Sequence, residues 1–122
     1  MSKSVLVVDD SSSVRTVVGI ALRRSGYEVI EAHDGHSALA KLDGRPIHLV
    51  ISDVNMPGMD GLTLLREIKK HPKYRCTPVM MLTTESAAEK KDIGRQEGAR
   101  AWMTKPFQAE QMVHAVQRLV MA

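Results

Sequence analysis

Residues 5–10 read VLVVDD, four branched apolar side chains followed at once by two carboxylates. A continuous apolar run, rather than an alternating one, is typical of a strand in a parallel sheet that is covered on both faces. The two acids come where this strand would end. Because ligands of open parallel sheets bind beyond the carboxyl ends of the strands, the stretch predicts an α/β domain with an acidic site at one edge of its sheet.

Further apolar runs of strand length follow along the chain, at residues 27–32, 47–51, 79–82 and 101–103. Stripes with helical spacing lie between and after them, one closed by Gly26 as a C-terminal cap and one opened by Asp60 as an N-cap. Strands that alternate with helices predict a doubly wound α/β domain, with five parallel strands and five helices. The fourth helical segment, residues 85–98, has Ile93 as its one large apolar residue, so we expect weak anchoring there.

Length and composition limit the class of protein. At 122 residues the chain has the size of one domain, so we expect residues 1–122 to form a monomeric unit without a covalent output domain. It has no run approaching the roughly 18 apolar residues of a membrane span and no secretory signal pattern, which favours the cytoplasm over membrane insertion. The net charge of +3 comes from scattered basic residues, so no nucleic-acid surface is predicted.

Five polar side chains are predicted to meet at one edge of the sheet. They follow or close four of the apolar runs: Asp9, Asp10, Asp53, Thr83 and Lys105. Each has a plainer explanation when it is taken alone; Asp10, for example, could cap the next helix. Together, three repelling acids indicate a bound cation or shared protons, and an all-oxygen set favours Mg²⁺, or Mn²⁺, over Zn²⁺.

The lysine adds a second requirement to this site. An ammonium opposite the acids indicates that an anion is held as well, and a divalent ion with a lysine and a hydroxyl suits phosphoryl transfer, which needs positioning and charge neutralisation. Asp53 is the natural phosphoryl acceptor because it stands alone on its strand, whereas Asp9 and Asp10 stand together as metal ligands.

Four stretches resemble the receiver domains of two-component response regulators, in particular the stand-alone, CheY-like chemotaxis type. They read VLVVDDSSSVR at 5–15, LVISDVNMPGMDGLTLL at 49–65, VMMLTTES at 79–86 and GARAWMTKPF at 98–107. The resemblance implies a flavodoxin-like sheet with strand order 2-1-3-4-5. It also implies a signalling protein that catalyses only its own phosphorylation and dephosphorylation and is otherwise not an enzyme.

The resemblance implies a role for each site residue. Asp53 would accept a phosphoryl group from the phosphohistidine of a histidine kinase. Asp10 and Asp53 would bind Mg²⁺ through their side chains and Asn55 through its backbone carbonyl, with Asp9 acting directly or through water. Asn55 and Glu85, at the positions that tune the lifetime of the phosphorylated state, imply rapid self-hydrolysis.

The switch implied by the resemblance includes Thr83 as its hydroxyl and Lys105 as the phosphate-pairing lysine, followed by a cis bond to Pro106. The output surface would be the fourth helix, the fifth strand and the last helix. Trp102 stands where the family usually has Tyr or Phe. It could swing between exposed and buried positions, or it could be a static, half-buried side chain, and the sequence leaves both open.

Two other functions, a phosphatase and a flavin binder, fit these residues less well. A haloacid-dehalogenase-type phosphatase needs a second acid two residues after its nucleophile, where this chain has Asn55, and a flavin phosphate would meet Asp9 and Asp10. Within the signalling class, the expected partners are a chemotaxis-type histidine kinase and a downstream protein such as a motor switch or another motility component. A phosphatase is a further candidate partner. A phosphate sink that drains a shared kinase is the alternative.

Overall fold

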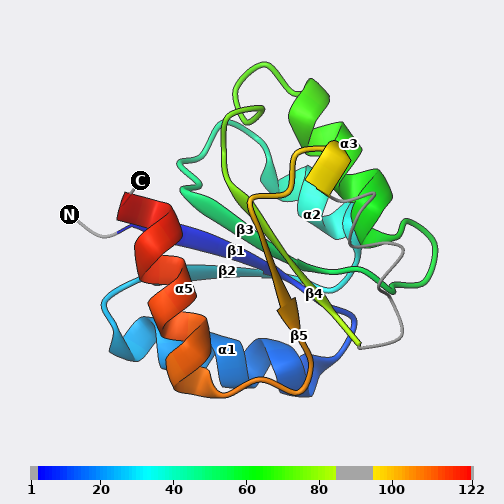
Figure 1. Ribbon diagram of the computed structural model, residues 1–122. Coiled ribbons are helices and arrows are strands. Elements are labelled where there is room, and N and C mark those ends of the chain that lie inside the picture. Colours follow the sequence, from blue (N-terminus) through cyan, green and yellow to red (C-terminus); the bar gives the residue numbers. More distant parts are fainter. Residues whose placement is uncertain (1–2, 85–94, 122) are drawn as a thin grey trace.

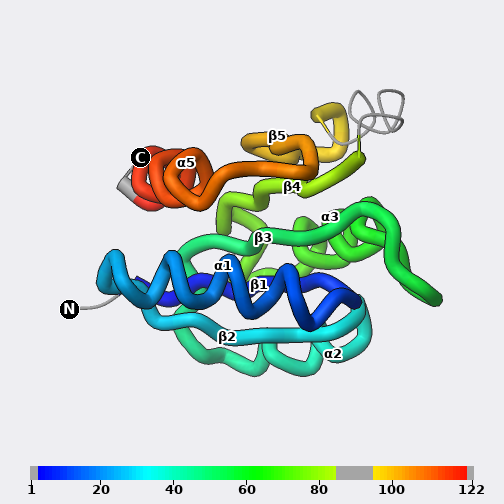
Figure 2. Tube along the Cα trace, turned by 90° about the horizontal axis from the view of Figure 1, so that it is seen from below, coloured from blue at the N-terminus to red at the C-terminus, as the bar shows by residue number. Residues whose placement is uncertain are grey.

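The computed structural model describes residues 3–84 and 95–121. Its five parallel strands are ordered β2-β1-β3-β4-β5, as predicted. Figure 2 shows them side by side from β2 to β5. Their bounds are β1 (Ser4–Val8), β2 (Glu28–Ala32), β3 (Leu49–Asp53), β4 (Val79–Thr83) and β5 (Ala101–Thr104).

Two helical layers cover the sheet (Figure 1). The helices in the described part of the chain are α1 (Ser12–Arg24), α2 (Gly35–Lys41), α3 (Gly61–Lys70) and α5 (Ala109–Met121). One core cluster joins the sheet to α1 and α5, and a second joins its other face to α2 and α3. The three strands β1, β3 and β4 are buried along their whole length, which explains their continuous apolar sequences.

The expected fourth helix lies largely outside the described residues, because residues 85–94 are not described, and Glu85 lies there too. In the two described ranges, no helix is long and apolar enough to cross a membrane.

The boundaries of β3 differ from the apolar run that predicted it. The run covers 47–51, whereas the strand covers Leu49–Asp53. His48 instead exchanges hydrogen bonds with Ser4: its backbone N–H donates to the Ser4 carbonyl at 2.8 Å, and its ring Nδ1 accepts from the Ser4 N–H at 2.9 Å. The later end places Asp53 inside the ladder, opposite Leu82. The candidate acceptor is therefore a strand residue with a fixed backbone.

Helix caps confirm two predictions from the sequence. The Asp60 side chain caps α3 by accepting from the Thr63 N–H at 2.8 Å. Gly26, just after α1, has a φ of 93°, which favours glycine. The N-cap of α1 is Ser11, whose hydroxyl accepts from Val14, so helix capping does not explain Asp10.

At Gly61, α3 approaches the end of β3 closely. Its N–H donates to the Val54 carbonyl at 2.8 Å. A Cβ on Gly61 would lie 2.2 Å from the Asp53 carbonyl oxygen and 2.8 Å from Met81 Cε. Since the first obstacle is backbone, it cannot move aside as a flexible side chain would. The absence of a side chain at Gly61 therefore allows α3 to pack directly beneath the candidate acceptor.

We predict that Gly61→Ala lowers the free energy of unfolding by about 1–3 kcal/mol, the usual cost of overpacking a well-packed interior. Urea unfolding measures it. The matched control is Gly19→Ala in α1, where the nearest obstacle is the Arg23 guanidinium at 3.1 Å, the end of a flexible side chain. That change should be neutral, or stabilising by up to about 1 kcal/mol through helix propensity. Equal losses in both variants would contradict the close approach at Gly61.

Candidate functional site

The register of the sheet brings the predicted site residues to one edge. Val8 lies opposite Ser52, so Asp9, the first residue after β1, lies beside Asp53, the last residue of β3. Likewise Thr83 ends β4 opposite Thr104, and Lys105 follows. All of these are carboxyl ends of parallel strands, where the crevice of an open sheet forms.

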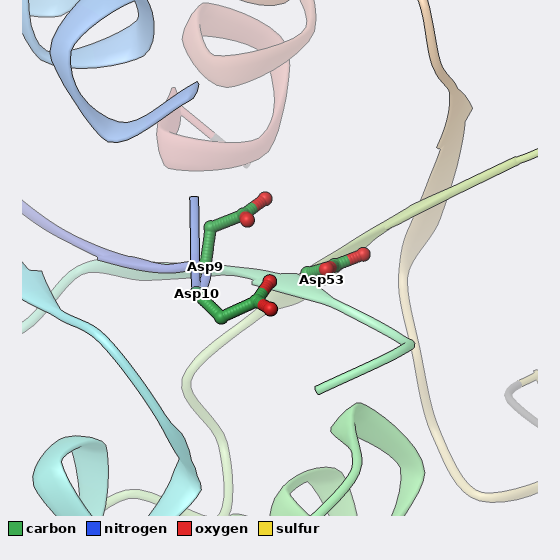
Figure 3. Close-up of side chains that lie close together, drawn as sticks. All are labelled: Asp9, Asp10 and Asp53. Atoms are coloured by element: carbon green, nitrogen blue, oxygen red, sulfur yellow. The ribbon is translucent and has the colours of Figure 1, made fainter. Parts of the chain in front are cut away.

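The three acids form a compact group. Asp9, Asp10 and Asp53 each offer a carboxylate oxygen, and these oxygens lie within 4.8 Å of one another. Figure 3 shows the side chains extending from the end of β1 and from β3 toward the same space. Asp9 and Asp53 are buried, whereas Asp10 is exposed. The cluster therefore has a fixed, buried side and a side open to solvent.

Both carboxylate oxygens of Asp9 already have protein partners. Oδ1 accepts from the Ser11 N–H at 2.9 Å, and Oδ2 accepts from Lys105 Nζ at 2.9 Å. With no solvent exposure, this carboxylate is held from two directions by the chain itself. Asp9 is thus the least free of the three acids to turn toward a ligand.

Lys105 is shared between two acids. Its Nζ lies 2.9 Å from Asp9 Oδ2 and 3.2 Å from Asp53 Oδ1. Burial on its own would lower the pKa of Lys105, but the two carboxylates outweigh it and raise the pKa, so the lysine stays charged. The bond between Lys105 and Pro106 is cis, as the resemblance implies.

Asp53 is in the opposite situation. Burial raises the pKa of Asp53, and the neighbouring charge of Asp9 raises it further. The Lys105 ammonium and a backbone hydrogen bond from Asn55 act against this shift without cancelling it. The free energy of the charged carboxylate is therefore high in the absence of a further cation, and a divalent ion or proton would relieve it.

Thr83 lies on the same edge and is buried. Its hydroxyl donates to the Thr84 carbonyl at 3.2 Å, and its own carbonyl accepts from the Lys105 N–H at 2.6 Å. The Thr83 hydroxyl thus lies beside the acidic site and is bonded to the backbone. A rotation about χ1 of Thr83 would break this bond and free the hydroxyl for another partner.

Trp102 comes from β5, opposite Met81 in register. It is half-buried and packs against the core cluster on the α2 and α3 face. Its Nε1–H is buried and, among the described residues, has no hydrogen-bond partner. The structure therefore places this Trp in an inward position, and whether it moves stays a prediction.

The donor set fits the expected metal. It consists of oxygen atoms only, in three carboxylates, one of them open to solvent, which suits a hard ion such as Mg²⁺ that keeps several waters. Sequence reasoning missed two residues that hold Asp9. The bond from the Ser11 N–H to the Asp9 carboxylate is a local turn contact that the Asp-x-Ser spacing could have suggested. The bond from Arg15 to the Asp9 carbonyl carries no such signal, because a backbone acceptor has no mark in the sequence.

Comparisons with known proteins show what the chain is similar to. The family described as response regulator receiver domain matches residues 5–117. The chain is 35% identical over 112 residues to protein PilG of Pseudomonas aeruginosa, covering 92% of this chain and 83% of PilG. It is 38% identical over 107 residues to the alkaline phosphatase synthesis transcriptional regulatory protein PhoP of Bacillus subtilis; this covers 88% of the chain but only 44% of PhoP.

Solved structures extend the likeness. The chemotaxis protein CheY4 of Vibrio cholerae superposes with a TM-score of 0.92 at 43% identity, covering 98% of this chain and 99% of that one. The fold is therefore shared along nearly the whole chain.

We predict that Asp53→Asn makes the metal-free protein more stable at neutral pH. The raised pKa of Asp53 means that its ionisation opposes folding above the folded-state pKa. That penalty shrinks as the pH falls through the folded-state pKa and vanishes below the unfolded one. The gain from asparagine, measured by urea unfolding in a chelator, should therefore be largest near pH 7 and disappear near pH 3.

Asp43→Asn is the matched control. A hydrogen bond from Arg45 holds the pKa of Asp43 well below its usual range, so neutralising Asp43 should bring no gain at any pH. If the Asp53→Asn protein is less stable than the original at pH 7, then the ion pair between Asp53 and Lys105 stabilises the fold by more than burial and repulsion from Asp9 destabilise it.

Proposed function

The chain belongs to the family of response regulator receiver domains, and from this we propose that it accepts a phosphoryl group on Asp53 from a histidine kinase and signals by binding a protein. The observation that carries the proposal is the position of the Asp53 carboxylate between two further acids and the Lys105 ammonium, 3.2 Å away. Membership of this family also favours a receiver over a phosphatase or a flavin binder.

In the proposed reaction, a carboxylate oxygen of Asp53 attacks the phosphorus of a phosphohistidine. The P–N bond breaks, its electron pair stays on the imidazole, and a P–O bond forms. The protein contributes mainly position and charge, as phosphoryl transfer requires. Lys105 would leave its contact with Asp53 and pair with a phosphoryl oxygen, so that the incoming charge meets a cation already in place.

Mg²⁺, or Mn²⁺, would neutralise phosphoryl oxygens when bound. We assign Asp10 and Asp53 as its side-chain ligands and the Asn55 carbonyl as a backbone ligand. Asp9 would act through water, because Ser11 and Lys105 already occupy both of its oxygens. Asp10 is the exposed member of the cluster and is open to the ion.

The response would begin at Thr83. Its hydroxyl would leave the Thr84 carbonyl and bond to the phosphoryl group, and Trp102 on the neighbouring strand would follow. We propose the fourth helix, β5 and α5 as the surface that changes. Asn55 and Glu85 would set a short phosphoryl lifetime by admitting water to Asp53.

The kinase would approach from the open side of the site. A pocket of about 450 Å³ reaches Lys105 between α1 and the segment after β5, lined by Val14, Val17, Thr84, Lys105 and Phe107 among others. Its apolar wall beside the lysine suits a helical phosphohistidine domain. We propose that the protein works in the cytoplasm with its kinase and that residues 1–122 form one receiver domain.

The downstream role follows from the likeness to CheY4, which is described as a chemotaxis protein. We propose a role in chemotaxis or motility, with a motor switch or another motility component as the target. The phosphate-sink role is the alternative. Capture of a target by the phosphorylated protein, but not by the Asp53→Asn protein, favours the signalling role, whereas transfer without any target favours the sink.

We predict that candidate histidine kinases carrying a labelled phosphoryl group transfer it to the protein in Mg²⁺ and not in excess chelator. Asp53→Asn should lose the label entirely, whereas Asp43→Asn, an exposed acid on the loop after α2, should be labelled like the original. Gel autoradiography over time measures both transfer and the rapid loss of label. Equal labelling of the original and the Asp53→Asn protein would refute the assignment of the acceptor.

We also predict that phosphorylation changes the fluorescence of Trp102, the only tryptophan, because its surroundings change when Thr83 turns toward the phosphoryl group. Beryllofluoride with Mg²⁺ can replace the phosphoryl group in the cuvette. Thr83→Ala should still bind the mimic but show a smaller fluorescence change. A spectrum that stays the same in the original protein would favour a static Trp102.

A further inference from the structure

Arg15 of α1 reaches back to the end of β1. Its Nη1 donates to the backbone carbonyl of Asp9 at 2.6 Å, and its Nε donates to Glu31 Oε1 at 3.2 Å. The arginine side chain is only 17% exposed, so this is no loose surface contact. Glu31 lies on β2, opposite Val7 of β1. One guanidinium thus joins α1, β1 and β2 directly behind the acidic cluster.

The bonded carbonyl belongs to the peptide between the two adjacent acids. A peptide unit is planar, so fixing the Asp9 carbonyl also fixes the N–H and Cα of Asp10. The other side of Asp9 is fixed as well, because its N–H donates to the Ala32 carbonyl at 3.1 Å. With these two bonds in place, Arg15 and β2 fix the peptide plane from which Asp10 extends.

From this geometry we propose that Arg15 is a positioning residue for the metal site, holding the Asp9–Asp10 peptide so that the Asp10 carboxylate faces Asp53. The inference rests on the proposed Mg²⁺ site and adds a residue that does not touch the ion. Glu31 in turn holds Arg15, and it also lies 3.6 Å from Arg23, a second and more exposed arginine.

Charge alone makes the opposite prediction, which gives the proposal a sharp test. A guanidinium near a cation site repels a divalent ion, so removing it without any change of geometry should strengthen Mg²⁺ binding. If Arg15 positions Asp10, removing the arginine should weaken Mg²⁺ binding even though the repulsion between guanidinium and ion is lost. A purely structural role would lower stability and leave the Mg²⁺ affinity of the folded protein unchanged.

The experiment titrates Mg²⁺ alone into the whole chain by calorimetry, and measures urea unfolding of each metal-free variant separately. We expect Arg15→Met to lose about tenfold in Mg²⁺ affinity, as is typical when a group supporting a metal ligand is removed. Arg15→Lys should lose less, because its ammonium can still donate to the Asp9 carbonyl. Arg23→Met is the matched control. Arg23 is 52% exposed and shares the Glu31 partner, so the Mg²⁺ affinity of this variant should equal that of the original protein.

Unchanged or tighter Mg²⁺ binding by Arg15→Met overturns the positioning role, whatever the stability. Should that variant fail to fold, Arg15→Gln carries the test, because its shorter side chain falls short of the Asp9 carbonyl, and an affinity equal to that of the original protein overturns the role. An original protein that binds no Mg²⁺ overturns the metal site itself, and the positioning role with it. The two failures are therefore distinguishable from one set of titrations.

Discussion

Three carboxylates gathered within 4.8 Å repel one another, and the arrangement of the rest of the site follows from how that repulsion is met. Lys105 lies between the two buried acids, and the Ser11 N–H bonds to one of them. These partners neutralise part of the charge. What is left raises the pKa of Asp53, whose burial also makes the charged form costly. The site is therefore stable enough to fold and still attractive to a cation.

Much of this could be predicted from the sequence, because the determining signals are local. Continuous apolar runs marked the buried strands, and the acids after them marked the sheet edge. Asp60 and Gly26 marked helix ends through their own side-chain and backbone chemistry. The family resemblance supplied the strand order and the role expected of each residue.

The rest depended on the exact ends of the strands and helices and on contacts between residues that lie apart in the sequence. The β3 strand ends later than its apolar run because pairing with β4 extends to Asp53. Ser11 rather than Asp10 caps α1, although both are capping residues by type. Arg15 had no signal of its own, since its partners are a backbone carbonyl and a glutamate on another strand. Glu85 and most of the expected fourth helix lie outside the described residues, so the roles proposed for them stay proposals.

Among the described residues, the buried indole N–H of Trp102 has no hydrogen-bond partner, and this affects the stability of its inward position. A buried donor without a partner costs about 1–3 kcal/mol relative to one that is hydrogen-bonded. The inward packing of this side chain, which gains from contact with the core, is therefore partly offset by the unmet donor. This cost narrows the free-energy gap between the inward position of Trp102 and any position in which its N–H contacts water. With a narrow gap, the proposed phosphorylation of Asp53 would need only a modest interaction energy to shift the population between the two arrangements.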